Sequence, residues 1–126
     1  MSSGSTPSDS QPWPVEIRLK RSERVLEVDF NDGRSFSYSA ELLRVESPSA
    51  DVQGHGPSQK TTPGGKRMVA ITAVEPVGNY AVRITFDDGH ATGIYSWRYL
   101  YEKLGVEQDS LWRDYLERIE QQGLIR

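Results

Sequence analysis

Two histidines, His55 and His90, are the side chains in this sequence that best suit metal binding. The chain contains no cysteine, which excludes disulfides, a thiolate nucleophile and thiolate metal ligands. Two histidines do not supply the usual four Cys/His ligands of a structural zinc site within one chain. A facial-triad iron site would need the order His-x-Asp, whereas His90 follows Asp88-Gly89. These residues favour a surface turn position for His90 over an iron ligand.

Other catalytic patterns are also missing. The segment from Gly54 to Thr61 superficially resembles a phosphate-binding loop, but Gln59 stands where glycine must precede the lysine. Pro63 and the glycines after it oppose the helix that such a loop needs, so we expect no ATP binding. The 18 acidic residues are scattered, and no serine lies in a Gly-x-Ser-x-Gly motif. The sequence therefore predicts a protein that is not an enzyme and has no cofactor.

Length and composition set further bounds. A chain of 126 residues suits one domain, and 36% hydrophobic residues are enough for a core. The net charge of −3 argues against nucleic acid or an anionic membrane as the main partner. The chain has no apolar run of about 20 residues and no apolar signal core, so we expect a cytoplasmic protein. The Ser/Pro-rich residues 1–14 are predicted to form a disordered tail that docks at most through Trp13.

Alternating apolar residues predict strands from residue 15 onward. One strand runs from Val15 to Leu19, and a second from Leu26 to Phe30. Asp32-Gly33 follows as a hairpin turn, because glycine readily adopts the positive φ that such a turn needs. Phe36 and Tyr38 continue the alternation, and Ser39 is the expected N-cap of a short helix.

The same order of elements returns later in the chain, where a turn at Gly78-Asn79 leads into a predicted strand from Tyr80 to Phe86. Phe86 follows Phe30 by 56 residues, Gly89 follows Gly33 by 56, and Ile94 follows Tyr38 by 56. The constant offset predicts a duplication of a strand-strand-strand-helix unit, at about residues 15–45 and 68–104. The predicted fold is therefore α+β, with a mainly antiparallel sheet, short helices and a C-terminal helix.

The rest of the predicted domain, residues 15–122, is one long loop and one helix. Residues 46–67 are rich in glycine and proline, which is typical of a functional or disordered loop. A C-terminal helix is expected at about residues 109–122, capped by Asp109 or Ser110 and ended by Gly123. Its apolar stripe predicts a face that docks on the sheet: Leu111, Trp112, Tyr115, Leu116 and Ile119.

Taken together, these motifs resemble a known family. The strand, turn and helix residues are similar to the small DUF971 domain at the N-terminus of γ-butyrobetaine hydroxylase, and bacterial stand-alone members share the Gly54-His55-Gly56 run. The resemblance covers about residues 15–104 and depends on Leu26, Val28, Phe30, Asp32, Gly33, Tyr38, Leu42, Leu43 and Arg44, then Val82, Ile84, Phe86, Asp88, Gly89, His90, Ile94 and Leu100.

The resemblance implies a zinc site that this chain has lost. In the hydroxylase, three cysteines and a histidine hold the metal. The matching positions here are Ser47, Ser49, Val52 and His90, so only His90 is retained and we expect no zinc. The hydroxylase reaction belongs to a separate catalytic domain, which a chain of this length does not contain.

The family context implies an accessory role. Relatives of the domain are also appended to P-loop iron–sulfur carrier proteins. We therefore expect a non-enzymatic domain that binds another protein, and Arg98 with an exposed aromatic neighbour is one candidate patch. For Trp97 itself, the sequence favours packing in the core. The alternative is a metal-linked accessory protein for iron–sulfur or iron enzymes, with His55 and His90 as ligands. Residues expected at a partner surface are Arg44, His55, Lys60, His90 and Arg98.

Overall fold

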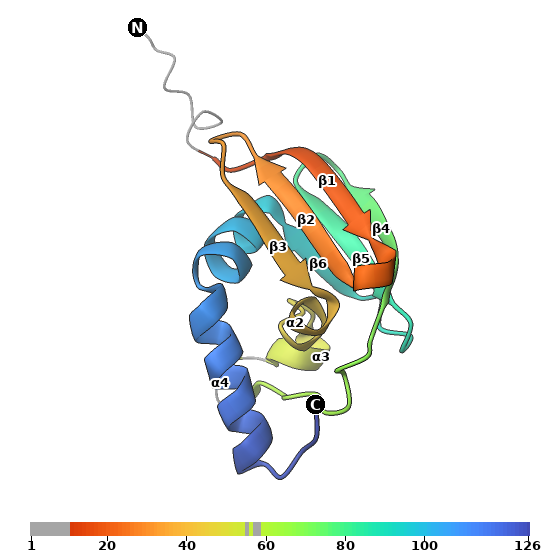
Figure 1. Cartoon of the computed structure of the whole chain (residues 1–126), viewed down its shortest axis with the longest axis vertical. Coiled ribbons are helices and arrows are strands. Elements are labelled where there is room, and N and C mark those ends of the chain that lie inside the picture. The colour runs from red at the N-terminus through yellow and green to blue at the C-terminus, as the bar shows by residue number, and fades with distance from the viewer. Residues whose placement is uncertain (1–10, 55, 57–58) are drawn as a thin grey trace, which may run out of the picture.

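The computed structural model describes residues 11–54, 56 and 59–126, and it shows two antiparallel sheets of three strands each. Figure 1 shows the sheets one behind the other, with the helices gathered along one side. This arrangement confirms the predicted α+β fold. The first sheet contains β1 (Pro14–Lys20), β2 (Val25–Phe30) and β3 (Ser35–Ser39), and the second contains β4 (Ile71–Val77), β5 (Ala81–Phe86) and β6 (Gly93–Ser96).

One helical turn lies between two strands, and the other helices come after the last strand of a sheet in the sequence. A 3-10 turn, η1 (Arg21–Glu23), joins β1 to β2. The other helices are α2 (Ala40–Val45), α3 (Ala50–Gln53), the π-helix η3 (Tyr99–Val106) and α4 (Gln108–Gln121). None of the helices in the described part of the chain is long and apolar enough to cross a bilayer.

The two sheets repeat one another in burial, register and turn geometry. In each unit the central strand buries alternate residues, which are Leu26, Val28 and Phe30 in β2 and Val82, Ile84 and Phe86 in β5. Both first strands carry a register irregularity at the same place, between Pro14 and Glu16 and between Ile71 and Ala73. The two turns also match, since Gly33 has a φ of 90° and Gly89 a φ of 92°. The repeat is therefore structural as well as sequential.

The repeat offset is not constant, and one predicted equivalence is wrong. Tyr38 pairs with Leu26 across the first sheet, and Tyr95 pairs with Val82 across the second. The counterpart of Tyr38 is therefore Tyr95, at an offset of 57, and not Ile94. Both tyrosines are fully buried, whereas Ile94 is 44% exposed. The loop after Gly89 is one residue longer than the loop after Gly33, and this shifts every later residue by one.

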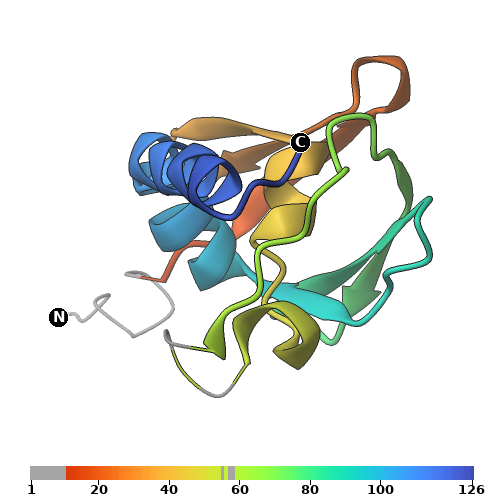
Figure 2. The same ribbon diagram turned by 90° about the horizontal axis from the view of Figure 1, so that it is seen from below.

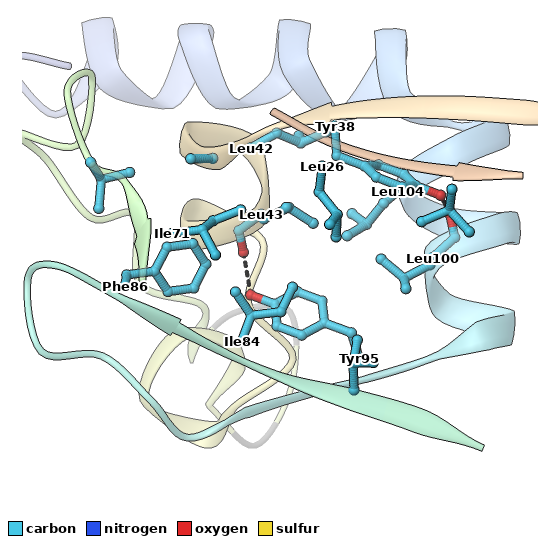
Figure 3. Close-up of a cluster of buried hydrophobic side chains, with 14 of the residues drawn as sticks. Leu26, Tyr38, Leu42, Leu43, Ile71, Ile84, Phe86, Tyr95, Leu100 and Leu104 are labelled. Atoms are coloured by element: carbon cyan, nitrogen blue, oxygen red, sulfur yellow. Dashed lines mark hydrogen bonds between the residues drawn. The ribbon is translucent and has the colours of Figure 1, made fainter. Parts of the chain in front are cut away.

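A pair of buried tyrosines ties each unit to the helix of the other unit. Tyr38 Oη donates to the carbonyl of Leu100 at 2.6 Å, and Tyr95 Oη donates to the carbonyl of Leu43 at 2.5 Å. Figure 3 shows the second bond inside the core. Leu43 lies in the last turn of α2, where a carbonyl has no helical partner. Each hydroxyl thus satisfies a buried acceptor on a segment far away in the sequence.

Both units begin their helices with the same serine cap. Ser39 Oγ accepts from Leu42 N at 3.0 Å, as predicted, and Ser96 Oγ accepts from Tyr99 N at 3.1 Å. Gly105 then lets η3 pass close to the first sheet, because a Cβ there would lie 2.9 Å from the ring of Phe36. The second helix therefore packs against the first unit at a position that excludes a side chain.

The C-terminal helix begins differently from the prediction. Its N-cap is Glu107, without a side-chain cap, since the chain enters α4 directly from η3 and needs no Asp109 or Ser110 cap. The prediction that Gly123 ends the helix agrees with the structure. Gly123 has a φ of 67°, and Leu124 N donates to the carbonyl of Ile119. These features form a Schellman motif.

The C-terminal part of the apolar face of α4 docks on α2. Tyr115 and Ile119 are buried against Val45, and Tyr115 Oη donates to Glu41 at 2.7 Å. Figures 1 and 2 show α2 lying between α4 and the second sheet. Leu116, also predicted for this face, is 37% exposed. Leu111 and Trp112 of the same face pack against the main core, which contains strand residues of both sheets, so the predicted face divides between that core and α2.

The region predicted as a long loop, residues 46–67, contains the single turn of α3 and is anchored by a buried carboxylate. Glu46, 1% exposed, binds Lys60 at 2.6 Å and Arg118 of α4 at 3.3 Å.

The N-terminal tail predicted for residues 1–14 overlaps β1, which begins at Pro14. Residues 1–10 of that predicted tail lie outside the described residues.

Removal of either buried tyrosine hydroxyl should destabilise the whole domain. We expect Tyr38→Phe and Tyr95→Phe each to lower the free energy of unfolding by about 1–2 kcal/mol, because a buried hydrogen bond between the two units is lost. Urea unfolding followed by circular dichroism measures this change. Tyr80→Phe is the matched control, since Tyr80 is 56% exposed, and it should stay within about 0.5 kcal/mol of the wild type. If all three variants were equally stable, the buried hydroxyls of Tyr38 and Tyr95 would not contribute to holding the two units together.

Candidate functional site

An ionic cluster surrounds the second Asp-Gly turn. Asp88 accepts from Arg44 Nε at 2.7 Å and from Lys66 Nζ at 2.6 Å, and its other oxygen accepts from the backbone N–H of His90. Burial by itself would raise the pKa of the Asp88 carboxyl. The hydrogen bonds from Lys66, His90 and Arg44 outweigh burial, and they hold this pKa well below its usual range. The turn is thereby fixed to α2 and to the end of the long loop.

His90 belongs to a second, neutral cluster next to the first. Its Nε2 lies 2.9 Å from Ser47 Oγ and 3.4 Å from Ser49 Oγ, so the ring joins the turn to the loop between α2 and α3. Burial lowers the pKa of His90, and the nearby Arg44 guanidinium lowers it further. His90 is therefore more than a surface turn residue, because it is a partly buried member of a hydrogen-bond network.

The residues at the four family ligand positions do not fit a zinc ion. The structure brings Ser47, Ser49 and His90 together, and Val52 is buried with no atom that could bind a metal. Stable zinc sites use thiolates, imidazoles and carboxylates, of which this set has one imidazole. Across residues 11–54, 56 and 59–126, no three His, Cys, Asp or Glu side chains are grouped so as to hold a metal. The second histidine, His55, lies outside the described residues.

The residues predicted for a partner surface do not form a single surface. Arg44 and His90 lie at the second Asp-Gly turn, and Lys60 is tied to the buried Glu46. Arg98 lies elsewhere, where it binds Glu102 at 2.8 Å and Gln11 at 2.5 Å. The position of His55 is not described. Among the members of this predicted set that the structure describes, Arg98 alone lines the groove described next.

Exposed aromatic side chains line a groove of about 710 Å³ beside the start of β1. We call this the aromatic groove, and its main lining residues are Pro12, Trp13, Asn79, Tyr80, Trp97 and Arg98. Trp13 is 51% exposed and Tyr80 is 56% exposed. Trp97 packs partly against the core, and its Nε1 donates to the carbonyl of Asn79 at 2.9 Å. Aromatic residues and arginine are the side chains most enriched at binding hot spots.

The backbone that carries Trp13 is held in place. Trp13 N donates to Asn31 Oδ1 at 3.1 Å, and Asn31 N donates to the carbonyl of Trp13 at 3.0 Å. Asn31 also donates to the carbonyl of Gln11 at 3.3 Å. The indole ring is therefore presented to solvent from a fixed backbone.

The internal repeat shows that the fold does not need these aromatic side chains. The hydrogen bonds that hold Trp13 recur in the second unit between Asp87 and Ala70, so an alanine suffices there. The backbone bond from Trp97 to Tyr80 likewise recurs in the first unit from Ala40 to Arg24. In all three positions the other unit has a residue that is not aromatic. The groove thus adds three aromatic side chains to positions that the duplicated scaffold fills without them.

Sequence reasoning found part of this groove and missed the rest. Trp13, Trp97 and Arg98 were singled out from the sequence, but Tyr80 was assigned to the strand that ends at Phe86. In that strand the alternation with Val82 and Ile84 would bury Tyr80. In the structure β5 begins at Ala81, and Tyr80 belongs to the turn that precedes it. The Gly78-Asn79 pair was the available signal, because a turn there frees the next residue from the alternation.

Comparison with known proteins agrees with the duplicated strand and turn motifs. The family model for the γ-butyrobetaine hydroxylase-like N-terminal domain matches residues 17–101. The chain belongs to this family. The match is to an N-terminal domain, and no catalytic domain is found with it. No curated protein matches the chain.

Three solved structures are similar to this γ-butyrobetaine hydroxylase-like domain. One solution NMR structure is 47% identical, with 98% of this chain and 91% of the other covered and a TM-score of 0.79. A second is 42% identical, with 93% and 91% covered and the same TM-score of 0.79. A crystal structure of a DUF971 protein of unknown function from Acidithiobacillus ferrooxidans is 44% identical, with 69% and 86% covered and a TM-score of 0.58.

The depressed pKa of His90 predicts a stability that falls in mild acid. The contribution of a neutral buried imidazole is complete above its ordinary pKa of 6.5, and it is lost as the pH falls through the lowered folded pKa. We expect His90→Gln to flatten the fall in unfolding free energy between about pH 7.5 and about pH 5.5. Urea unfolding across this range measures the slope.

The second histidine provides the control for this experiment. The chain has two histidines, so His55→Gln removes the other imidazole while it leaves the Ser47–His90 contact intact. His55→Gln should keep the wild-type slope. An unchanged slope in His90→Gln, or a flattened slope in His55→Gln, would show that the acid sensitivity has another source.

Proposed function

We propose that this protein is a non-enzymatic accessory domain that binds another protein through the aromatic groove. The observation that supports this most directly is the exposure of Trp13 and Tyr80 on backbone positions that the other unit fills without aromatic residues. Exposed tryptophan and tyrosine offer large contact areas for little loss of conformational freedom. The fold has no need of them there, so a role in binding is the simplest reason for their presence.

The rest of the described chain supports binding over catalysis. Most polar groups brought together at the second Asp-Gly turn bond one another, with Asp88 held by Arg44 and Lys66 and His90 by Ser47. The exception among the described residues is Arg44 Nη1, which is buried without a hydrogen-bond partner and so does not face a substrate. General acid–base chemistry needs a group that can reach a substrate, and these groups are occupied by structural contacts. The alternative of a metal-linked accessory role finds no cluster of three ligand side chains in the part of the chain that the structure describes.

Differential capture from lysate tests the proposal. We expect at least one protein to be retained by immobilised wild-type chain and lost with the double variant Trp13→Ala, Tyr80→Ala. Val106→Ala is the matched control, because Val106 is 54% exposed and does not line the groove, and it should retain the same protein. Mass spectrometry of the three eluates identifies the difference, and circular dichroism verifies that all three chains are folded.

One outcome of the capture experiment would contradict the proposal. If the wild type, the double variant and Val106→Ala capture the same proteins in the same amounts, the groove is not the binding surface. Elemental analysis and metal titration of the purified chain then test the metal-linked alternative separately. Iron or zinc bound at submicromolar affinity, and lost on His90→Ala, would replace the proposed function with that alternative.

A further inference from the structure

We propose that the aromatic groove binds an extended, proline-containing segment of a partner protein that carries a carboxylate. This inference rests on the proposed function, since it specifies the occupant of the same surface. It goes further by deriving the chemistry of that occupant from the lining of the groove. Three features of the lining carry it: the aromatic faces, the single charge, and the fixed backbone.

The aromatic faces favour proline. Trp13, Tyr80 and Trp97 line the same groove, together with Pro12. Grooves lined by exposed aromatic rings recognise polyproline II segments, whose pyrrolidine rings pack against the ring faces. Such segments are already extended before binding, so they lose little conformational entropy when they dock.

The charge in the groove favours a carboxylate. Among the described residues that line the groove, Arg98 is the one that carries a charge, and no acidic side chain lines it. Arg98 is paired with Glu102, which does not itself line the groove, so the charged group that the groove presents is a guanidinium. A guanidinium presents a planar fork of donors that matches a carboxylate.

The present partners of Arg98 are easily exchanged. Its ion pair with Glu102 is solvent-exposed on both sides, with side chains 53% and 52% exposed. Exposed pairs of this kind contribute little to stability, at most about 1 kcal/mol. Its other contact is with the side chain of Gln11, a neutral acceptor. A carboxylate on the partner can therefore take a place at Arg98 without disturbing the fold.

The fixed backbone of the groove favours a defined binding geometry. Asn31 holds the backbone of Trp13 through two hydrogen bonds, one accepted by its side-chain Oδ1 and one donated by its backbone N–H, and the bond from Trp97 Nε1 to Asn79 fixes the second indole. Neither contact has to be broken to admit a ligand at the ring faces. The groove is therefore preorganised, and the cost of ordering on binding is small.

Synthetic peptides test the inference. The probe is a blocked peptide of eight prolines followed by two aspartates, titrated into 15N-labelled full-length protein. We expect shifts of the Trp13 and Trp97 indole N–H signals, with saturation, and no saturable shift for a Gly-Ser peptide of equal length with the same aspartates. Replacement of the two aspartates by lysines should weaken binding about tenfold, which is the effect expected for one charged hydrogen-bonded pair.

Variants of the protein assign the binding to the groove. Trp13→Ala with Tyr80→Ala should abolish the shifts, and Val106→Ala should leave them unchanged. Arg98→Glu should reverse the preference, so that the lysine peptide binds better than the aspartate peptide. Arg98→Gln should remove the preference without reversing it, and it keeps the test interpretable if repulsion between the introduced carboxylate and Glu102 alters the fold.

The alternatives give distinct results. Equal binding of the proline and Gly-Ser peptides, or binding that survives the double variant, would overturn the inference. A concentration-dependent dimer that is abolished by Trp13→Ala with Tyr80→Ala would assign the groove to a second copy of the chain and also overturn it. If no peptide binds but lysate capture still depends on Trp13 and Tyr80, the occupant is wrong and the proposed function stands. If both experiments fail, both proposals are wrong.

Discussion

Each half of this domain completes the other half through a buried tyrosine hydroxyl. Tyr38 of the first sheet bonds the carbonyl of Leu100, and Tyr95 of the second sheet bonds the carbonyl of Leu43 (Figure 3). An isolated three-stranded sheet with a short helix would expose its apolar face, and the first unit would also leave the carbonyl of Leu43 at the end of α2 without a partner. Because a buried carbonyl without a partner is costly, the exchange makes the two units depend on one another. The main hydrophobic core accordingly contains residues of both sheets.

Each Asp-Gly turn also contacts the helix of the other unit. The carboxylate of Asp32 accepts from the hydroxyl of Tyr101 on the second helix, and the carboxylate of Asp88 accepts from Arg44 on the first. Tyr101 follows Arg44 by 57 residues, the offset that also relates the two tyrosines of the core. The turn carboxylate is thus bound by a phenol in one half and by a guanidinium at the equivalent position in the other half. The scaffold fixes where a contact must be made and leaves open which side chain makes it.

A comparison of the two units therefore distinguishes the residues that the fold requires from those that it does not require. Where the two units agree, as at the capped helices and the Asp-Gly turns, the residues satisfy backbone groups. Where they differ, the chain has added something that the scaffold does not require. Trp13, where the second unit has Ala70, and Tyr80, where the first unit has Arg24, are such additions. The serines around His90 are another difference, and there the added contacts are internal hydrogen bonds that join a loop to a turn.

The sequence by itself determined the local elements, the duplication and the family. Strand alternation, the Asp-Gly turns and the Ser39 cap depend on near neighbours in the chain, and these predictions agree with the structure. Tertiary structure decided what depends on distant contacts. It placed Tyr95 rather than Ile94 opposite Tyr38, since one extra loop residue changes which face a side chain occupies. It docked α4 on α2, and it brought Trp13, Tyr80 and Trp97 into one groove. Their separations of 67 and 17 residues carry no periodic signal, because only the folding of the two sheets against each other makes them neighbours.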